Sequence, residues 1–198
     1  MGSAADAVPD RLTAGRPAAR RTPHTPRSSR HDRRPAPHRP DRRPADVALL
    51  HTAVAVARRA RAAGNHPFGA LLTGPDGAIL LEAENTVTTE RDATGHAETN
   101  LVRLATARYD ADFLRACTLY TSTEPCAMCA GAIYWGNVGR VVYALGEDGL
   151  LAMTGADEKN PTMALPCRDV FAAGQRPLEV VGPVDLPEAR EVHAGFWD

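Results

Sequence analysis

Residues 96–98 read His-Ala-Glu, and after 26 intervening residues the stretch 125–129 reads Pro-Cys-Ala-Met-Cys. Zinc takes imidazole and thiolate ligands, and a catalytic zinc ion keeps three protein ligands with a fourth position open for water. Three such ligands are present here, namely His96, Cys126 and Cys129. Glu98 stands beside them as a carboxylate that the metal does not need, which is the kind of group that transfers protons. We therefore expect one catalytic zinc ion per chain.

Each motif alone has a simpler interpretation. A single C-x-x-C pair can be a redox pair or one half of a structural zinc site. A closed structural site needs a fourth ligand, but the two other cysteines, Cys117 and Cys167, do not stand in ligand-like pairs. We predict helices over 96–108 and 126–135, and a helix N-terminus favours thiolate over thiol. Zinc bound there would lower the pKa of water from 15.7 to about 7.

Helices and strands alternate around these motifs. Apolar spacing predicts a first helix over 46–64, with Asp46 as its N-cap and Gly64 at its end. Apolar runs between turn residues predict five strands, over 69–73, 78–82, 117–122, 140–144 and 178–182. A Gly-Pro-Asp-Gly turn joins the first two strands as a hairpin, and a short helix is expected over 187–194. This order favours an α/β fold, a three-layer α/β/α sandwich around a mixed five-stranded sheet.

The first 46 residues differ in composition from the rest of the chain. They hold 8 of the 16 prolines and carry 11 Arg against 5 Asp, a balance of +6, whereas the remainder has a balance of −7. Such a segment cannot bury enough apolar surface to offset its ordering entropy. We expect a disordered extension over 1–46 and one domain over 47–198. A basic tether to nucleic acid is the functional alternative for the extension.

Composition also bears on compartment and partners. No apolar stretch approaches the roughly 20 residues that a membrane-spanning helix needs, and the Arg- and Pro-rich start is unlike a signal peptide. We therefore expect a cytoplasmic protein without membrane contact. The acidic body is poorly suited to gripping a polyanion, which disfavours nucleic-acid binding without excluding it.

From about residue 47 onward, the sequence resembles the cytidine and deoxycytidylate deaminase superfamily. It is most similar to the branch of bacterial guanine deaminases and tRNA adenosine deaminases. The matching stretches are 67–70 (PFGA), 84–85 (EN), 96–98 (HAE) and 119–135 (LYTSTEPCAMCAGAIYW). H-x-E with P-C-x-x-C is the recorded signature of zinc deaminases. The resemblance implies a cytidine deaminase-like fold, hydrolytic deamination and a homodimer.

The resemblance also implies roles for individual residues. Glu98 would take a proton from water, pass it to the substrate ring and later protonate the departing amine, which leaves as ammonia. Asn85 would hydrogen-bond the substrate, the Ala97 N–H would meet a ring carbonyl, and Phe68 would wall the ring. Simpler alternatives are a loop-capping role for Asn85 and core packing for Phe68. For Trp135, a pocket wall, a dimer contact and core packing remain open.

One further region departs from the family pattern, and another lies at the end of the chain. The resembling enzymes have a second acidic residue for proton relay within 146–166, where the match is weak. Asp157 is the nearest candidate by position and Asp148 the next, although either could be a solvated loop carboxylate. Phe196 and Trp197 look like an aromatic lid over the ligand. Ordinary packing onto the body is the alternative.

The best single interpretation is an enzyme that deaminates a free nucleobase or nucleoside, with guanine converted to xanthine as the first guess. Adenosine-to-inosine editing in tRNA is a second interpretation, and cytosine or a triazine remains a candidate substrate. A third interpretation, from a different functional class, is a zinc protein without enzymatic activity. Glu98 argues against it, because a purely structural zinc site has no use for an acid at that place.

Overall fold

The computed structural model describes residues 43–155 and 163–197. In this part of the chain, five strands form one sheet in the order β2-β1-β3-β4-β5. The strands are β1 (Gly69–Thr73), β2 (Ile79–Glu84), β3 (Thr118–Thr123), β4 (Arg140–Leu145) and β5 (Glu179–Val181). β1 pairs antiparallel with β2 and with β3, whereas the β3–β4 and β4–β5 pairs are parallel. The predicted mixed five-stranded sheet is confirmed.

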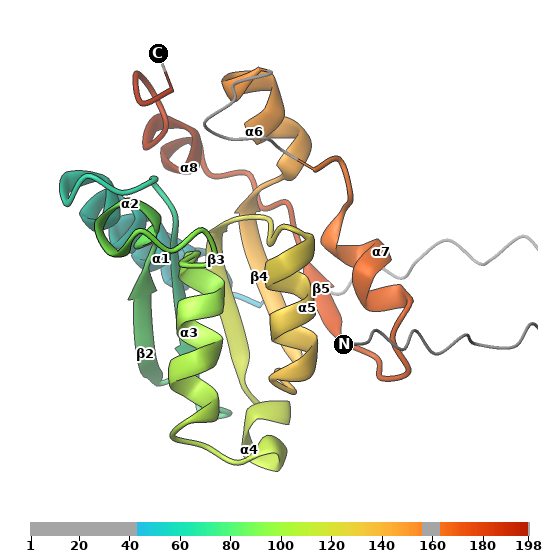
Figure 1. Ribbon diagram of the computed structural model, residues 1–198. Coiled ribbons are helices and arrows are strands. Elements are labelled where there is room, and N and C mark those ends of the chain that lie inside the picture. Colours follow the sequence, from blue (N-terminus) through green and yellow to red (C-terminus); the bar gives the residue numbers. More distant parts are fainter. Residues whose placement is uncertain (1–42, 156–162, 198) are drawn as a thin grey trace, which may run out of the picture. The chain divides into compact units, whose positions relative to one another are not determined.

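Helices cover both faces of this sheet, which gives the three layers (Figure 1). The long helix α1 (Asp46–Ala62) packs on one face, and α3 (Ala97–Thr106) and α5 (Ala127–Trp135) lie side by side on the other. The remaining helices are short: α2 (Val87–Glu90), α4 (Ala111–Arg115), α6 (Glu147–Thr154), α7 (Cys167–Ala172) and α8 (Pro187–Glu191).

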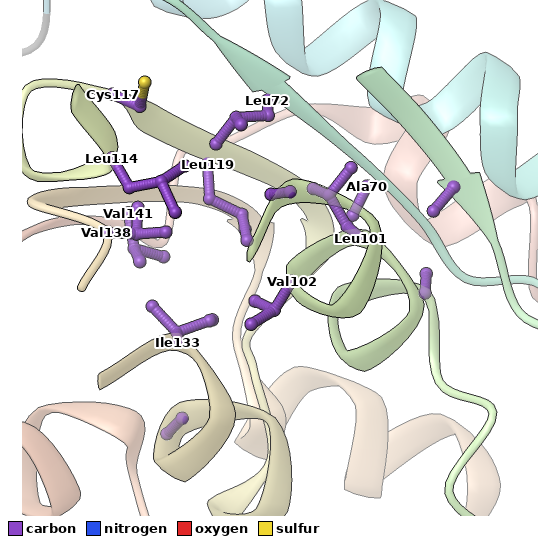
Figure 2. Close-up of a cluster of buried hydrophobic side chains, with 14 of the residues drawn as sticks. Ala70, Leu72, Leu101, Val102, Leu114, Cys117, Leu119, Ile133, Val138 and Val141 are labelled. Atoms are coloured by element: carbon purple, nitrogen blue, oxygen red, sulfur yellow. The ribbon is translucent and has the colours of Figure 1, made fainter. Parts of the chain in front are cut away.

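The larger hydrophobic core lies between the sheet and the α3–α5 layer (Figure 2). Leu101 and Val102 from α3 and Ile133 from α5 point toward Leu119 and Val141 on the strands. Strands β1, β3 and β4 are buried along their whole length, because helices cover them on both faces. Strands covered in this way tend to have continuous apolar sequences rather than alternating ones, as β1 and β4 do.

A second core lies on the opposite face, beneath α1. Leu50 and Val54 of the helix pack there against Leu71, Tyr120 and Val142 of the sheet. Gly69 lets α1 come this close, because a Cβ at that position would lie 2.3 Å from the backbone nitrogen of Ala57. Any side chain there would push the helix off the sheet.

Asp46 shows the main local difference from the sequence prediction. It is the first residue of α1 rather than its N-cap, which is Ala45. Its side chain is fully buried and binds the guanidinium of Arg140 through two bonds of 2.8 and 2.9 Å, and it accepts a third from the Tyr120 hydroxyl at 2.9 Å. The domain therefore includes Asp46, one residue earlier than the expected boundary.

The other predicted elements are present with small shifts at their ends. The strand expected over 69–73 is found with those bounds, and the others shift by one to two residues. The terminal helix ends at Glu191 rather than at residue 194, and Cys126 is the N-cap of α5 rather than its first residue. Helices α2, α4, α6 and α7 were not predicted, because each is shorter than two and a half turns and shows little periodicity.

Two sequence predictions fall wholly or partly outside the described residues. They are the extension predicted over residues 1–46, of which residues 1–42 lie outside, and the proton-relay candidate Asp157. Within the part of the chain that the structure describes, none of the helices has the length and apolar character required to cross a membrane.

Candidate metal centre and substrate site

The starts of α3 and α5 bring the three predicted metal ligands together. His96 is the N-cap of α3, Cys126 is the N-cap of α5, and Cys129 lies in the first turn of α5. Because the two helices are neighbours on one face of the sheet, residues about 30 positions apart in sequence meet at the same end of the layer. One ligand atom from each of the three lies within 4.8 Å of the others.

The spacing of these atoms fits zinc. Nδ1 of His96 lies 3.7 Å from Sγ of Cys126 and 3.5 Å from Sγ of Cys129. Zn–N bonds of about 2.0–2.1 Å and Zn–S bonds of about 2.3 Å at a tetrahedral angle place N and S about 3.6 Å apart. The two measured separations bracket this value. Among the described residues, Cys117 and Cys167 are buried elsewhere and do not join the group, as predicted.

The charge state of one of the two cysteines, Cys126, also suits a metal. The Cys129 thiol, together with the His96 ring, lowers the pKa of Cys126 to about 4. At neutral pH this ligand is therefore a thiolate, which is the form that binds zinc. In turn, the bond to Cys126 raises the pKa of His96.

Glu98 lies beside the ligands and is almost fully buried, with 5% of its surface exposed. Its Oε1 accepts a hydrogen bond of 2.6 Å from the Thr121 hydroxyl, and its Oε2 accepts one of 3.4 Å from Sγ of Cys129. Burial raises the pKa of Glu98, and the bond from Thr121 partly counteracts this. The carboxylate thus reaches the metal ligands without being one of the three.

Asn85 makes the capping bond that the sequence offered as the simpler alternative, and its role in substrate binding stays a prediction. Its side-chain oxygen accepts a bond of 3.1 Å from the N–H of Val87, which is the loop-capping role. Its side-chain nitrogen Nδ2 is buried and has no partner among the described residues. A buried donor without a partner costs free energy, so this nitrogen is available to a ligand. Ala97 is also fully buried, and as the first residue of α3 it has an N–H that the helix itself does not bond.

An aromatic cluster connects Phe68 with the C-terminal residues. The Phe68 ring lies 5.2 Å from that of His193 and 6.2 Å from that of Trp197, and His66 lies 5.3 Å from Trp197 and 5.9 Å from Phe196. The indole N–H of Trp197 donates to Nδ1 of His193 at 3.4 Å. Phe68 is half-buried and its backbone carbonyl accepts from the N–H of Asn85. The chain end therefore packs onto the segment that precedes β1, and this segment is hydrogen-bonded to Asn85 through Phe68.

Trp135 does not lie where a substrate residue would. It is the last residue of α5 and is 85% exposed, in edge-to-face contact with Tyr134. Nine helical rises of 1.5 Å separate it from Cys126, a distance of about 13 Å along the axis. The prediction that Trp135 packs in the core is therefore wrong, and the structure does not place this residue at the metal ligands. A dimer contact stays a prediction.

The structure points to an acidic residue that the sequence prediction missed. Glu147, at the start of α6, is partly buried, and its backbone N–H donates to Glu124. Burial, and then the nearby Cys126, Glu124 and Glu98, raise the pKa of Glu147 to about 7. Its neighbour Asp148, which the sequence offered as a relay candidate, is exposed and caps the N–H of Gly149. The sequence signal that could have identified Glu147 was its position just after a buried strand.

Comparison with known proteins agrees with this site. Residues 44–145 match the family model described as the cytidine and deoxycytidylate deaminase zinc-binding region. A probable cytosine deaminase from Schizosaccharomyces pombe is 42% identical over 154 residues, which is 77% of this chain and 93% of that protein. Guanine deaminase from Bacillus subtilis is 51% identical over 78 residues, or 39% of this chain and 49% of that protein. A tRNA-specific adenosine deaminase from Aquifex aeolicus is 34% identical over 95 residues, covering 48% of this chain and 62% of that protein.

Solved structures share the fold over most of the described chain. Guanine deaminase from Nitrosomonas europaea has a TM-score of 0.60 at 27% identity, covering 74% of this chain and 84% of that chain. A mutant protein solved in complex with 8-azaguanine has a TM-score of 0.62 at 26% identity, covering 75% of this chain and 84% of that chain. The solved structures that share this fold thus include one in complex with a nucleobase analogue.

Proposed function

Because the chain belongs to the cytidine and deoxycytidylate deaminase family, we propose that its substrate is a free nucleobase, with guanine converted to xanthine as the leading case. The family makes it a zinc-binding, hydrolytic deaminase that acts on nucleobases or nucleosides. In such a reaction, water replaces the exocyclic amino group of the ring by a carbonyl oxygen, and ammonia leaves.

The observation that carries the proposal is the position of Glu98 among the three ligands. Zinc held there supplies a Lewis acid that lowers the pKa of water to about 7. The carboxylate of Glu98 is held by Thr121 on one oxygen and contacts Cys129 with the other. We assign Glu98 the proton transfers: it moves one proton of the attacking water to a ring nitrogen. It then moves the second proton of that water to the amine, which leaves as ammonia while the carbonyl forms.

Asn85 and Ala97 would hold the ring in place. The unpartnered Nδ2 of Asn85 can donate to a ring acceptor, and so can the N–H of Ala97 at the start of α3. Both groups are buried, so a substrate that lacks the matching acceptors would leave them without partners. Such a site discriminates strongly against analogues without those acceptors.

The aromatic cluster favours a small substrate over a polynucleotide. Trp197 and Phe196 pack on His66, and burial together with the nearby His96 lowers the pKa of His66. The chain end therefore packs on His66 and on Phe68, the residue that would wall the ring. We propose that Phe196 and Trp197, with Phe68, form a lid over a single ring, which excludes water during the reaction. An adenosine in a tRNA loop would need an open path through this lid.

Cytosine is the second candidate substrate, because one relative is named a probable cytosine deaminase and aligns with this chain over 93% of its own length. The same zinc ligands, Glu98 and Asn85 serve either ring, since both reactions exchange an amino group beside a ring nitrogen for a carbonyl. The size of the space under the lid decides between a purine and a pyrimidine.

Ammonia release from a panel of substrates tests the proposal. The zinc-loaded full chain is incubated with guanine, cytosine, adenine, their nucleosides and a tRNA anticodon stem-loop that carries adenosine. We expect ammonia from guanine, or in second place from cytosine, with kcat/KM far above that for the stem-loop. Glu98→Gln is the matched control, because it keeps the size and zinc ligands of the site but removes the proton-transfer group. Inosine formation in the stem-loop without turnover of any free base would overturn the substrate assignment.

We also propose a homodimer and a dispensable extension. The exposed Trp135 on α5 is a surface that supports the first proposal. Light scattering of wild type and Trp135→Ser measures the mass directly, and a monomeric wild type would reject it. Removal of residues 1–42 should leave the zinc content and turnover of free base unchanged.

A further inference from the structure

The carboxylate of Glu98 is held in an unusual way for a buried acid. Within residues 43–155 and 163–197, no arginine or lysine forms an ion pair with it. Its one short bond comes from a neutral hydroxyl, that of Thr121, at 2.6 Å. Both side chains are buried, at 0% exposed for Thr121 and 5% for Glu98. A short O–H···O bond to a carboxylate is among the stronger hydrogen bonds in proteins.

The strand that carries Thr121 is a rigid support. Thr121 lies in β3, the middle strand of the sheet, and pairs with Ala70 of β1 and Tyr143 of β4. Threonine is branched at Cβ and therefore has few side-chain rotamers in a strand. Its hydroxyl has a single proton, and that proton is used on Oε1 of Glu98. Oε1 is thereby fixed, while Oε2 faces Cys129.

We propose that Thr121 is a positioning residue for the deamination reaction. Its hydroxyl holds Oε1 of Glu98, so that Oε2 remains directed at the metal ligands during each proton transfer. The inference rests on the proposed role of Glu98 as the proton carrier. Without the hydroxyl bond, the carboxyl group can turn about its last torsion, which is broad for glutamate, and spends less time in the productive orientation.

The decisive variant is Thr121→Val, which keeps the shape and the preference for a strand and removes only the hydroxyl. We expect kcat to fall about 10- to 100-fold, the range that follows from loss of a hydrogen bond to a charged group. KM should change little, because Thr121 does not touch the substrate. Zinc content and the midpoint of thermal unfolding should stay near wild type. Thr121→Ser, which restores the hydroxyl, should recover most of the kcat.

A matched control and a double mutant separate positioning from a structural role. Thr118→Val makes the same change at another buried threonine of β3 and should leave kcat near wild type. Its side chain has no hydrogen bond to any other residue that the structure describes. In the Glu98→Gln background, Thr121→Val should cause no further loss, because the group that it positions is gone. A structural defect would instead lower activity by the same factor in both backgrounds.

The measurements are made on whichever base or nucleoside the wild type deaminates. Wild-type kcat in Thr121→Val, with Glu98→Gln inactive, would overturn the positioning role and leave the proposed function standing. Loss of zinc or of folded protein in Thr121→Val in proportion to its loss of activity would also overturn it. A Glu98→Gln variant that is as active as wild type would refute the proposed function instead.

Discussion

Two buried carboxylates lie on opposite faces of β3, and they differ in the kind of group that binds them. Asp46, on the α1 face, binds Arg140 through both oxygens and also accepts from Tyr120 and from the N–H of Arg43. Glu98, on the α3 face, has the Thr121 hydroxyl and the Cys129 thiol. The residues that bind them on β3 are neighbours, because adjacent side chains of a strand point to opposite faces.

The difference appears in the pKa of each group. Burial alone would raise the pKa of Asp46, but the bonds from Arg140, Arg43 and Tyr120 outweigh it and hold the pKa below 3.8. For Glu98, burial dominates and raises the pKa. A fully compensated carboxylate stays ionised and stabilises the fold. A carboxylate without a cation can exchange its proton, which is what a general acid–base group requires.

The strongest test of this comparison is Glu98→Gln. We expect turnover to fall by at least the roughly 10²–10⁴-fold that general acid–base catalysis contributes. The free energy of unfolding should change little, because the amide keeps the size of the side chain and its oxygen can still accept the bond from the Thr121 hydroxyl. Steady-state kinetics, metal analysis and urea unfolding on one preparation measure all three quantities. Turnover within tenfold of wild type would contradict the role of Glu98 as the proton-transfer group.

Asp46→Ala should show the opposite pattern. It leaves Arg140 buried without its main partner, which costs about 3–5 kcal/mol of stability in comparable cases. Turnover per folded molecule should remain close to wild type, because the α1 face lies away from the metal ligands. Urea unfolding and kinetics below the unfolding transition measure these effects.

A double variant, Asp46→Leu with Arg140→Met, is the control for that experiment. It replaces the pair with apolar residues of similar size and should recover much of the lost stability. If Asp46→Ala lowers kcat without lowering stability, the assignment of Asp46 to the fold alone is wrong.

Trp197→Ala tests the proposed lid and should have a smaller effect. The indole packs on Phe68, His66 and His193, so its loss should open the site to water. We expect kcat/KM for a free base to fall about tenfold, equivalent to roughly 1.4 kcal/mol, with a smaller change in stability. A melting temperature that falls enough to account for the lost activity would show ordinary packing rather than a lid.

The smallest expected effect is a pH dependence. The pKa of Asp46 is lower in the folded state than its usual value, so its contribution to stability is fully present above about pH 4. That contribution is lost as the pH falls through the folded-state pKa. The unfolding free energy of wild type should therefore fall more steeply below pH 4 than that of the Asp46→Leu, Arg140→Met variant. Parallel slopes in urea unfolding at pH 7, 4 and 3 would refute the contribution of the pair.

Local sequence patterns were sufficient for the sheet and for the metal ligands. The β1–β2 hairpin follows from its Gly-Pro-Asp-Gly turn, and the ligand group follows from residues placed at two helix starts. The turn pattern acts over a few residues, and the ligand pattern depends only on two helices that share a layer. This is why the ligands His96, Cys126 and Cys129 could be named in advance.

Contacts between distant residues could not be read in the same way. Asp46 meets Arg140 across 94 positions, so the local signal of an N-cap was misleading. Thr121 lies in β3 among other residues with hydroxyl side chains, so the local sequence does not show which hydroxyl has a partner 23 residues earlier. For Trp135, the apolar character of α5 suggested burial as readily as exposure. Such assignments require the tertiary structure.

The adjacency of Tyr120 and Thr121 has a consequence for how this gene can change over evolution. An insertion or deletion of one residue within β3 would turn every later side chain of the strand to the other face. The phenol would leave Asp46 and the hydroxyl would leave Glu98 in the same event. Viable length changes should therefore collect in exposed turns such as the one between β1 and β2, and β3 should keep its length in every functional descendant.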